Sequence, residues 1–222
     1  MNAQNNKNSR VWFITGTSGG MGSELVRAVL RRGDSVVATS RNPQKVADTF
    51  GAHKDQLLAV AVDLGNSDQI SGAVQAGISR FGKIDVLVNN AGYGLLGAVE
   101  EANDDEISRV HEINVFGLLR VLRAVLPHFR ERKSGHVVNL SSISGLVGLP
   151  GIGIYNATKF AVEGISEALA AEVAPLGIKV TVVEPGPFRT EFLAGSLALA
   201  KNVIPEYEKT VGVTRAGAAT RN

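Results

Sequence analysis

The sequence contains no cysteine, and this absence narrows the chemistry that the protein can use. Disulfides, thiolate metal ligands and a cysteine nucleophile are all excluded. The four histidines, His53, His111, His128 and His136, do not have the spacing of metal ligands, so no metal site is expected. A chain without cysteine suits a reducing compartment, and we expect a cytoplasmic protein.

A strong charge of one sign and a long apolar run are also missing. The 222 residues carry a net charge of +2 without a basic block, which gives no support for binding to nucleic acid or to a membrane surface. Charged residues interrupt each apolar stretch well before the roughly 18 residues that a membrane span needs. Residues 1–9 are polar and predict a disordered leader. Residues 10–222 contain no Pro/Ser/Gly-rich linker and predict a single domain.

Short apolar runs alternate with amphipathic stretches along the whole domain. The runs predict about six buried strands, at 11–15, 35–39, 57–62, 84–88, 136–140 and 178–183. The stretches predict helices from Met21 to Gly33, from Pro43 onward, and at 68–81, 103–115, 116–131 and 153–173. This alternation indicates an α/β fold, a doubly wound and Rossmann-like parallel sheet with helices on both faces.

Each apolar run ends in residues that a buried strand would not choose. These are Gly16, Ser40, Arg41, Asp63, Asn89, Asn90, Ser141, Ser142, Pro185 and Gly186. The carboxyl ends of parallel strands lie along one edge of a sheet, and ligands of such folds bind there. We therefore expect the functional site at this carboxyl edge.

A glycine-rich turn, Gly16-x3-Gly20-x-Gly22, joins the first strand to the first helix. Glycine allows a tight turn and lets a diphosphate approach the backbone amides, and the helix beginning near Met21 offers unpaired N–H groups. The spacing differs from G-x-G-x-x-G, and no Lys-Ser/Thr pair follows, which excludes a P-loop. The turn by itself is weak evidence for a nucleotide site.

Tyr155 and Lys159 stand four residues apart and should share one face of the helix at 153–173. A free phenol has a pKa of about 10, which a nearby cation lowers by favouring the phenolate. On the spacing alone, an ordinary surface pair is the favoured interpretation. Other parts of the sequence are needed to show whether Tyr155 and Lys159 form a catalytic pair.

Six motifs occur together in a fixed order. They are Thr15-Gly16-x3-Gly20-x-Gly22, Asn89-Asn90-Ala91-Gly92, Asn114, Ser142, Tyr155-x3-Lys159 and Pro185-Gly186. In this order they resemble the classical short-chain dehydrogenase/reductase family, from about Val11 to Thr190. The resemblance implies an oxidoreductase that interconverts a carbonyl and an alcohol by hydride transfer. A nucleotide-binding regulatory or scaffold protein without turnover is the alternative on the same fold.

The resemblance also implies the catalytic roles. Tyr155 would be the general acid/base, and Lys159 would lower the pKa of this phenol and bind the nicotinamide ribose. The family's serine, which polarises the substrate oxygen, stands thirteen residues before the tyrosine. Ser142 has this spacing and Ser141 does not, so Ser142 would take that role. Asn114 would hold a water that links the lysine to solvent, although an asparagine that caps or kinks a helix explains this position as well.

The end of the second strand predicts the cofactor. Enzymes that use NAD commonly place a carboxylate there to bind the ribose 2′-hydroxyl, whereas this chain has Ser40 followed by Arg41. A guanidinium suits a 2′-phosphate, so we expect NADP(H), although a solvated surface arginine would explain Arg41 alone. The expected cofactor contacts are Gly16, Ser18, Gly20, Met21, Gly22, Ser40, Arg41, Asp63, Leu64, Asn90, Ala91, Gly92, Tyr155, Lys159, Pro185, Gly186 and Thr190.

The substrate side is less sharply defined. Apolar residues suited to a small lipophilic carbonyl or alcohol are Leu95, Leu96, Leu146, Val147, Leu149, Phe188, Phe192 and Leu193, several of which core packing explains equally well. Residues 188–211 are expected to form a substrate lid. Residues 214–222 read as loop, so we expect either that the seventh strand, which the family places after the lid, is absent or that the chain is a truncated copy.

The resemblance further implies a homodimer through the helices at 103–131 and 153–173. Small and apolar residues suit close packing on the outward side of the second helix: Ala157, Phe160, Ala161, Gly164, Ala168 and Ala171. For Ala161 and Ala168 a position against the sheet is an equal alternative. The family uses its seventh strand in tetramers, so a weakened or missing tetramer is expected.

Overall fold

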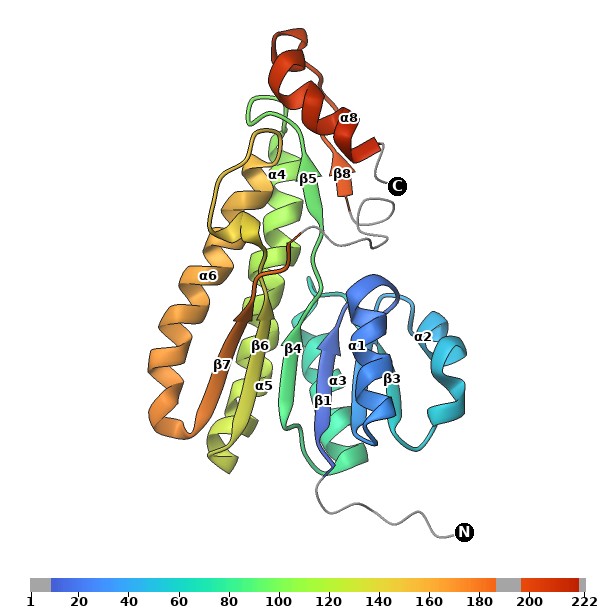
Figure 1. The fold of residues 1–222 in the computed structure, drawn as a ribbon. Helices are drawn as coiled ribbons and strands as arrows, with labels where there is room; N and C mark the ends of the chain where they lie inside the picture. The colour runs from blue at the N-terminus through green and yellow to red at the C-terminus, as the bar shows by residue number, and fades with distance from the viewer. Residues whose placement is uncertain (1–8, 187–196, 220–222) are drawn as a thin grey trace.

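The computed structural model describes residues 9–186 and 197–219, and its centre is one parallel sheet of six strands (Figure 1). The strands are β1 (Val11–Thr15), β2 (Ser35–Ser40), β3 (Leu57–Ala61), β4 (Val86–Asn89), β6 (Gly135–Leu140) and β7 (Ile178–Val183). Their order is β3-β2-β1-β4-β6-β7, and every neighbouring pair is parallel. The order reverses between β1 and β4, so the Rossmann-like, doubly wound prediction is confirmed.

Helices pack on both faces of the sheet. Buried residues of α1 (Gly20–Arg31) and α2 (Pro43–Phe50) join one apolar cluster with one side of the strands. Buried residues of α3 (Ser67–Phe81), α5 (Leu118–Arg132) and α6 (Gly153–Val173) join a second cluster with the other side. Strands buried from both sides read as continuous apolar runs, which is why the sequence located them well.

One part of the first face lies open. No described helix packs there over β6 and β7, and Lys179, Thr181 and Val183 of β7 are exposed on it. Short 3-10 turns complete the connections at η1 (Gly51–His53), η3 (Ile143–Gly145) and η4 (Ala174–Leu176). Among the helices in the described ranges, none is long and apolar enough to cross a membrane.

Local capping sets where several helices begin and end. Asn42 accepts a hydrogen bond from the Lys45 amide (3.2 Å), and Pro43 occupies the first turn of α2. Asn66 caps α3, which ends at Gly82 in the left-handed conformation with φ of 79°. A capping box between Asn103 and Glu106 starts α4 (Asp104–His111).

The two helices predicted at 103–115 and 116–131 are joined without a break. A π-helical turn, η2 (Glu112–Gly117), connects α4 to α5. Such turns are rare and are concentrated at functional sites, because the widened backbone redirects a side chain. Here the turn contains Asn114, which is only 3% exposed.

The C-terminal segment forms a small unit beside β5 (Gly94–Leu96). Strand β8 (Leu197–Leu199) pairs with β5 in a second parallel sheet, and η5 (Pro205–Tyr207), η6 (Glu208–Gly212) and α8 (Val213–Ala219) follow. In Figure 1 this unit lies at the end of the molecule toward which the strands of the main sheet point. The expectation of a loop over 214–222 is therefore wrong for residues 214–219.

A buried carboxylate explains why this unit is ordered. Glu101 is fully buried, accepts hydrogen bonds from the amides of Ala98 (2.6 Å) and Ile204 (2.8 Å), and forms an ion pair with Arg215. The Arg215 guanidinium, opposed by burial, lowers the pKa of Glu101 to about 2. Helix α8 thus depends on a contact more than one hundred residues away, which local sequence patterns do not report.

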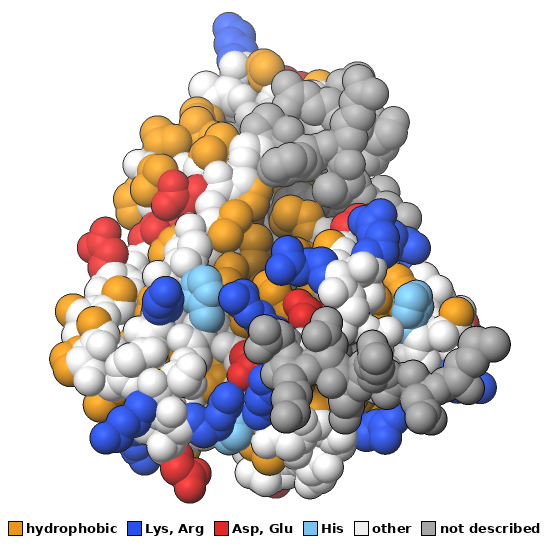
Figure 2. All heavy atoms as spheres, turned by 60° about the horizontal axis from the view of Figure 1, so that its bottom comes forward, with side chains coloured by type: hydrophobic (Ala, Val, Ile, Leu, Met, Phe, Trp, Pro, Cys, Tyr) orange, Lys and Arg blue, Asp and Glu red, His pale blue; other side chains and the backbone are white. Residues whose placement is uncertain are grey.

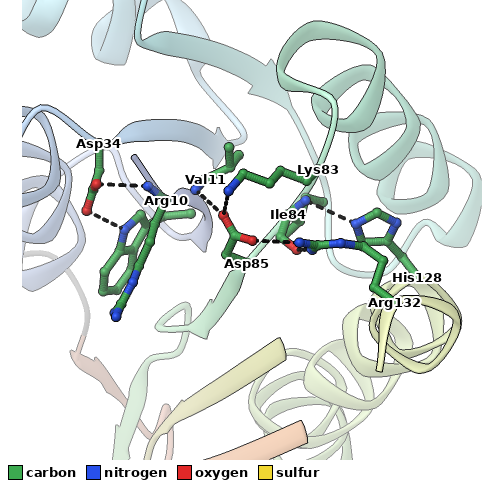
Figure 3. A network of polar contacts seen from close by, with 9 residues as sticks. Arg10, Val11, Asp34, Lys83, Ile84, Asp85, His128 and Arg132 are labelled. Carbon is green, nitrogen blue, oxygen red and sulfur yellow. Dashed lines mark hydrogen bonds and ion pairs between the residues drawn. The ribbon is translucent and has the colours of Figure 1, made fainter. Parts of the chain in front are cut away.

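At the amino edge of the sheet, where its strands begin, two aspartate carboxylates form hydrogen bonds and ion pairs with groups from other segments (Figure 3). Asp34 accepts hydrogen bonds from the Arg10 amide (2.9 Å) and the Trp12 indole (3.1 Å). Asp85 accepts one from the Val11 amide (2.9 Å) and pairs with Lys83 and Arg132, each at 2.9 Å. These contacts tie β1 to the residues that precede β4 and to the end of α5.

Candidate active site

The turn after β1 has a shape that only small residues allow. Gly16 and Gly20 adopt φ angles of 71° and 54°, in the region that favours glycine. A Cβ atom added at Gly22 would lie 2.1 Å from the carbonyl oxygen of Gly16 and 2.6 Å from Nδ2 of Asn90. The turn is consequently pressed against the start of α1, with its backbone exposed to a ligand at the switch point of the sheet.

Asn90 and Thr15 hold this turn against the end of β4. The Asn90 side-chain amide donates to the carbonyl oxygens of Thr15 (2.9 Å) and Gly16 (3.0 Å). The Thr15 hydroxyl accepts hydrogen bonds from the amides of Asn90 and Ala91, both at 3.0 Å. The two motifs that sequence analysis placed at neighbouring strand ends therefore form one rigid structure.

The N-terminus of α1 keeps its capacity to bind an anion. Its N-cap residue is Gly19, which offers no side-chain cap, and the first turn contains no acidic residue. Unpaired N–H groups and the helix dipole both favour a phosphate at such a terminus. Ser18 is half-buried in the turn and Met21 is partly exposed at the helix start, as a phosphate-binding turn requires.

The predicted 2′-phosphate position lies at the end of β2. Ser40 is buried, and its hydroxyl accepts a hydrogen bond from the Asn42 amide (2.9 Å). Arg41 is exposed and forms no ion pair with the part of the chain that the structure describes. Next to this strand, the exposed Asp63 accepts a hydrogen bond from the Gly65 amide (2.9 Å), and Leu64 is buried with its carbonyl oxygen bound to an arginine.

Asn114 connects three elements of the site. Its Oδ1 accepts a hydrogen bond from the Tyr93 amide (3.0 Å), and its Nδ2 donates to the Tyr93 carbonyl (2.8 Å) and to the Thr158 hydroxyl (3.1 Å). Thr158 in turn donates to the carbonyl oxygen of Tyr155 (2.7 Å). The π turn thus anchors both the loop after β4 and the first turns of α6, where Gly92 also lies close to Asn114 and Lys159.

Lys159 lies on the same face of α6 as Tyr155, as their spacing predicts, but it is buried, whereas the spacing alone favoured a surface pair. Its Nζ donates to the Leu140 carbonyl at the end of β6 (2.7 Å) and lies 5.7 Å from the centre of the Tyr155 ring. Burial lowers the pKa of Lys159 to about 8, against the opposing effect of the Glu163 carboxylate. The ammonium is therefore close to titrating near neutral pH.

The phenol of Tyr155 differs from the expectation in one respect. Burial raises its pKa above the ordinary value of 10.0, and a side-chain hydrogen bond with Ser142 opposes that shift without reversing it. The expected lowering of the phenol pKa by Lys159 is absent, and desolvation of the buried phenolate is the dominant effect. Ser142 also caps η3 by accepting the Ser144 amide (3.1 Å).

The chain matches the family model described as short chain dehydrogenase over residues 10–198. This protein belongs to the short-chain dehydrogenase family. The match covers the whole main sheet, so the resemblance predicted from the six motifs is confirmed.

Relatives of this short-chain dehydrogenase include two named proteins. Oxidoreductase BOA17 of Botryotinia fuckeliana is 44% identical over 207 residues, which is 92% of this chain and 74% of that protein. A 3-ketodihydrosphingosine reductase of Bacteroides thetaiotaomicron is 43% identical over 183 residues, which is 82% of this chain and 65% of that protein.

Solved structures show the same fold. A short-chain dehydrogenase from Streptomyces avermitilis superposes with a TM-score of 0.88 at 42% identity, covering 94% of this chain and 77% of that one. A 3-ketoacyl-(acyl-carrier-protein) reductase from Brucella melitensis in complex with NADH has a TM-score of 0.80 at 33% identity (83% and 78% covered). A gluconate 5-dehydrogenase from Burkholderia cenocepacia with NADP and tartrate has a TM-score of 0.78 at 30% identity (82% and 73% covered). Proteins of this fold thus bind nicotinamide cofactors of both kinds.

The predicted pocket residues of this short-chain dehydrogenase fall into three groups. Leu95 and Leu96 are buried in β5, where they pack in the small sheet. The loop after Ser142 exposes Leu146, Val147 and Leu149, at 59%, 49% and 40%. Phe188, Phe192 and Leu193 lie outside the described residues, as does the predicted cofactor contact Thr190. Of the other cofactor contacts predicted in this segment, Pro185 accepts a hydrogen bond from the Ile143 amide, and Gly186 is exposed beside it.

Sequence analysis missed some residues that complete the site. Tyr93 and Thr158 share hydrogen bonds with Asn114, and Glu163 faces the lysine from the next turn of α6. Two of the three stood inside or beside recognised motifs, which was a usable signal. No cluster of three or more side chains suited to a metal occurs within the described ranges.

Proposed function

We propose that this protein is an NADP(H)-dependent oxidoreductase that interconverts a carbonyl and an alcohol. The observation that supports the proposal best is the meeting of three side chains at the carboxyl edge. Tyr155 and Lys159 extend from α6 to the end of β6, where Ser142 forms a side-chain hydrogen bond with the phenol. A phenol, a hydroxyl and a buried ammonium are the groups that reduction of a carbonyl needs besides the hydride.

In this mechanism the nicotinamide, when bound, supplies or accepts the hydride. In the direction of reduction, Ser142 donates a hydrogen bond to the substrate oxygen, and Tyr155 gives its phenolic proton to the developing alkoxide. The Lys159 ammonium stabilises the phenolate that remains and binds the ribose. Asn114 fixes the backbone around this group through Tyr93 and Thr158. In oxidation each transfer runs in reverse.

The preference for NADP(H) rests on the end of β2. Ser40 places no carboxylate there, and the exposed Arg41 has no acidic partner among the described residues. A guanidinium without a protein counter-ion is suited to a 2′-phosphate. Burial of the Ser40 hydroxyl leaves Arg41 as the group available to the cofactor.

For the substrate we propose a lipophilic ketone or alcohol. Four exposed apolar side chains follow Ser142 closely: Ile143, Leu146, Val147 and Leu149. Exposed apolar residues grouped beside a reactive hydroxyl favour an apolar substrate over a sugar. The relative named as a 3-ketodihydrosphingosine reductase acts on a substrate of this kind, to judge from its name.

For assembly we propose a homodimer through α5 and α6. Five of the six predicted contact residues on α6 are exposed, namely Ala157, Phe160, Gly164, Ala168 and Ala171, while Ala161 is half-buried. Phe116, near the end of η2 and two residues before α5, is 49% exposed. A monomer at micromolar concentration in light scattering would argue against this interface. A stable tetramer would argue against a dimer as the final assembly.

Two further predictions complete the proposal. Residues 188–211 are proposed as a substrate lid; residues 188–196 lie outside the described part of the chain, and residues 197–211 belong to the small unit beside β5. Limited proteolysis with and without a lipophilic substrate analogue would test the assignment, because protection is expected only within this range. Cytoplasmic location would be tested by fractionation of the source cells.

The decisive experiment is NADPH consumption against a panel of ketones and aldehydes of increasing chain length. Tyr155→Phe should lower kcat by at least about 100-fold, the size of a general acid contribution, and leave NADPH affinity nearly unchanged. Thr181→Val is the control, because it also removes a hydrogen-bonded hydroxyl, which contacts His136 (2.8 Å) on the exposed face of β7 and belongs to neither the proposed site nor the lid. Undiminished turnover in Tyr155→Phe would overturn the assignment. NADPH binding without turnover across the panel would favour the regulatory alternative.

A further inference from the structure

Two charged side chains, Lys159 and Glu163, stand one turn apart on helix α6. They lie near the end of β6, where Leu140 is followed by Ser141. The ammonium of Lys159 binds the carbonyl oxygen of Leu140 (2.7 Å). Both the Glu163 carboxylate and the Ser141 hydroxyl lie beside Gly145: a Cβ atom added there would be 3.0 Å from Glu163 Oε1 and 2.7 Å from Ser141 Oγ. The missing side chain at Gly145 therefore leaves room for this carboxylate next to the residue that precedes Ser142.

These two polar atoms lack the partners that buried groups normally have. Oε1 of Glu163 and Oγ of Ser141 are buried, and neither has a hydrogen-bond partner within the described part of the chain. A buried carboxylate oxygen without a donor costs free energy, so its retention calls for a compensating interaction. The nearby ammonium of Lys159 is the cation that can supply one.

The charged surroundings of Lys159 are few. On α6, the titratable side chains that face it are Tyr155 and Glu163. The other contacts are uncharged, and they come from the loop after β4, from η2 and from β6: Gly92, Asn114 and the Leu140 carbonyl. Glu163 opposes the effect of burial on the pKa of Lys159. No second carboxylate among the described residues shares that task.

We propose that Glu163 is a positioning residue for the reaction: held beside Ser141 in the space over Gly145, its carboxylate keeps Lys159 in the ammonium form at neutral pH. The inference rests on the proposed function, because it acts through the lysine assigned to the ribose and the phenolate. It assigns to Glu163 an electrostatic role without contact to substrate or cofactor.

The direct test is an NMR titration of the lysine side chains in cofactor-free protein, with the Lys159 signal identified by its loss in Lys159→Met. Removing the negative charge in Glu163→Gln should lower the pKa of Lys159 by about one pH unit, as expected for a partly buried pair. Glu167→Gln, an exposed position one turn further along α6, is the matched control and should leave the titration unchanged. Glu163→Asp should restore most of the wild-type value.

The same shift should appear in catalysis. In the pH profile of kcat/KM, the alkaline limb should move to lower pH in Glu163→Gln, and the wild-type limb should return in Glu163→Asp. An unchanged Lys159 titration in folded Glu163→Gln would overturn the proposal. If Glu163→Gln does not fold, Glu163→Asp provides the test. This variant keeps the negative charge, so a Lys159 titration that differs from wild type in Glu163→Asp would also overturn the proposal. A shifted titration in a protein without turnover would count against the proposed function and support this inference.

Discussion

The amino and carboxyl edges of the sheet are both polar, but their side chains are used differently. At the amino edge, the carboxylates of Asp34 and Asp85 bind backbone amides, an indole and three cations. Figure 2, which turns this end of the molecule forward, shows basic and acidic side chains interspersed on that face. At the carboxyl edge, the start of α1 has no side-chain cap, and Arg41 has no acidic partner among the described residues.

The difference separates stability from binding. Polar groups that already have protein partners hold strands together, whereas donors left without one remain available to a ligand. Substitutions at the amino edge should therefore reduce stability and leave turnover per folded molecule unchanged. Substitutions at the carboxyl edge should change cofactor binding or rate with smaller effects on folding.

The largest effect is expected from Gly22→Ala. The added methyl would lie 2.1 Å from the Gly16 carbonyl oxygen, and the turn cannot retreat because Asn90 and Thr15 hold it. NADPH affinity should fall by more than about 100-fold in a fluorescence titration, since the backbone proposed to bind the phosphates must open by an ångström or more. Gly72→Ala in α3 is the control: its site is open, and stability should rise by up to about 1 kcal/mol. Normal NADPH affinity in Gly22→Ala would contradict the proposal that the carboxyl edge of the sheet is used for binding.

Asp85→Ala should give the largest effect at the amino edge. The change leaves the Val11 amide and the cations of Lys83 and Arg132 without their acceptor, which should lower the free energy of unfolding by about 2 to 4 kcal/mol in denaturant titrations. Asp55→Ala, at an exposed turn, should stay within about 0.5 kcal/mol of wild type. A loss of kcat per folded molecule would contradict the separation of the two edges.

The same residue predicts a pH dependence. Burial raises the pKa of Asp85, but hydrogen bonds and charges from Lys83, Val11 and Arg132 together bring it below the ordinary value of 3.8. A carboxyl whose folded-state pKa is lowered stabilises the protein above its unfolded-state pKa and loses that effect as the pH falls through the folded value. Below about pH 4, the stability of wild type should therefore fall more steeply than that of Asp85→Ala. If stability fell equally steeply with pH in wild type and in Asp85→Ala, the Asp85 carboxylate would not be the source of the acid-induced loss of stability.

Arg41→Ala should change cofactor choice with little effect on stability. Loss of a charged hydrogen bond to the 2′-phosphate should reduce the NADPH over NADH preference by about 1.5 to 3 kcal/mol in kcat/KM. Arg31→Ala, an exposed arginine in the last turn of α1, should leave the preference unchanged. Equal kcat/KM for both cofactors in the wild type would defeat the prediction.

The smallest effect is expected just before β6. Lys133 is the one non-glycine residue with positive φ in the described part of the chain, at 49°. Lys133→Gly should raise the free energy of unfolding by about 0.5 to 1 kcal/mol without altering turnover. Gly177→Ala, just before β7, should have the opposite sign, because its Cβ would lie 2.4 Å from the Lys133 carbonyl oxygen. A destabilised Lys133→Gly variant would contradict this account.

Local chemistry made the main sheet and α6 predictable. Apolar runs bounded by glycine, asparagine and proline located the six strands, and α6 spans the predicted residues Gly153–Val173. The convergence of Asn114, Tyr155 and Lys159 followed from motif order and parallel strands. These features depend on residues close together in the sequence or on one shared sheet edge.

Features that depend on distant contacts were not predictable. The π turn at 112–117 is fixed by bonds between Asn114 and Tyr93, and β8 pairs with a strand about one hundred residues earlier. The raised pKa of Tyr155 follows from burial, which the Tyr155-x3-Lys159 spacing does not encode. Glu163 escaped notice because its neighbours Ser141 and Gly145 belong to another segment.

The Glu101–Arg215 pair has a consequence for the order in which the molecule is made. A growing chain contains Glu101 long before it contains Ile204, 103 residues later, or Arg215, 114 residues later. Until those partners exist, the carboxylate cannot enter the interior without a large desolvation cost. Strands β1 to β4 can associate early through nearby segments, whereas the region around β5 reaches its final packing only after Arg215 has been made. The side of the molecule proposed for the substrate then matures later than the half proposed to bind the nucleotide.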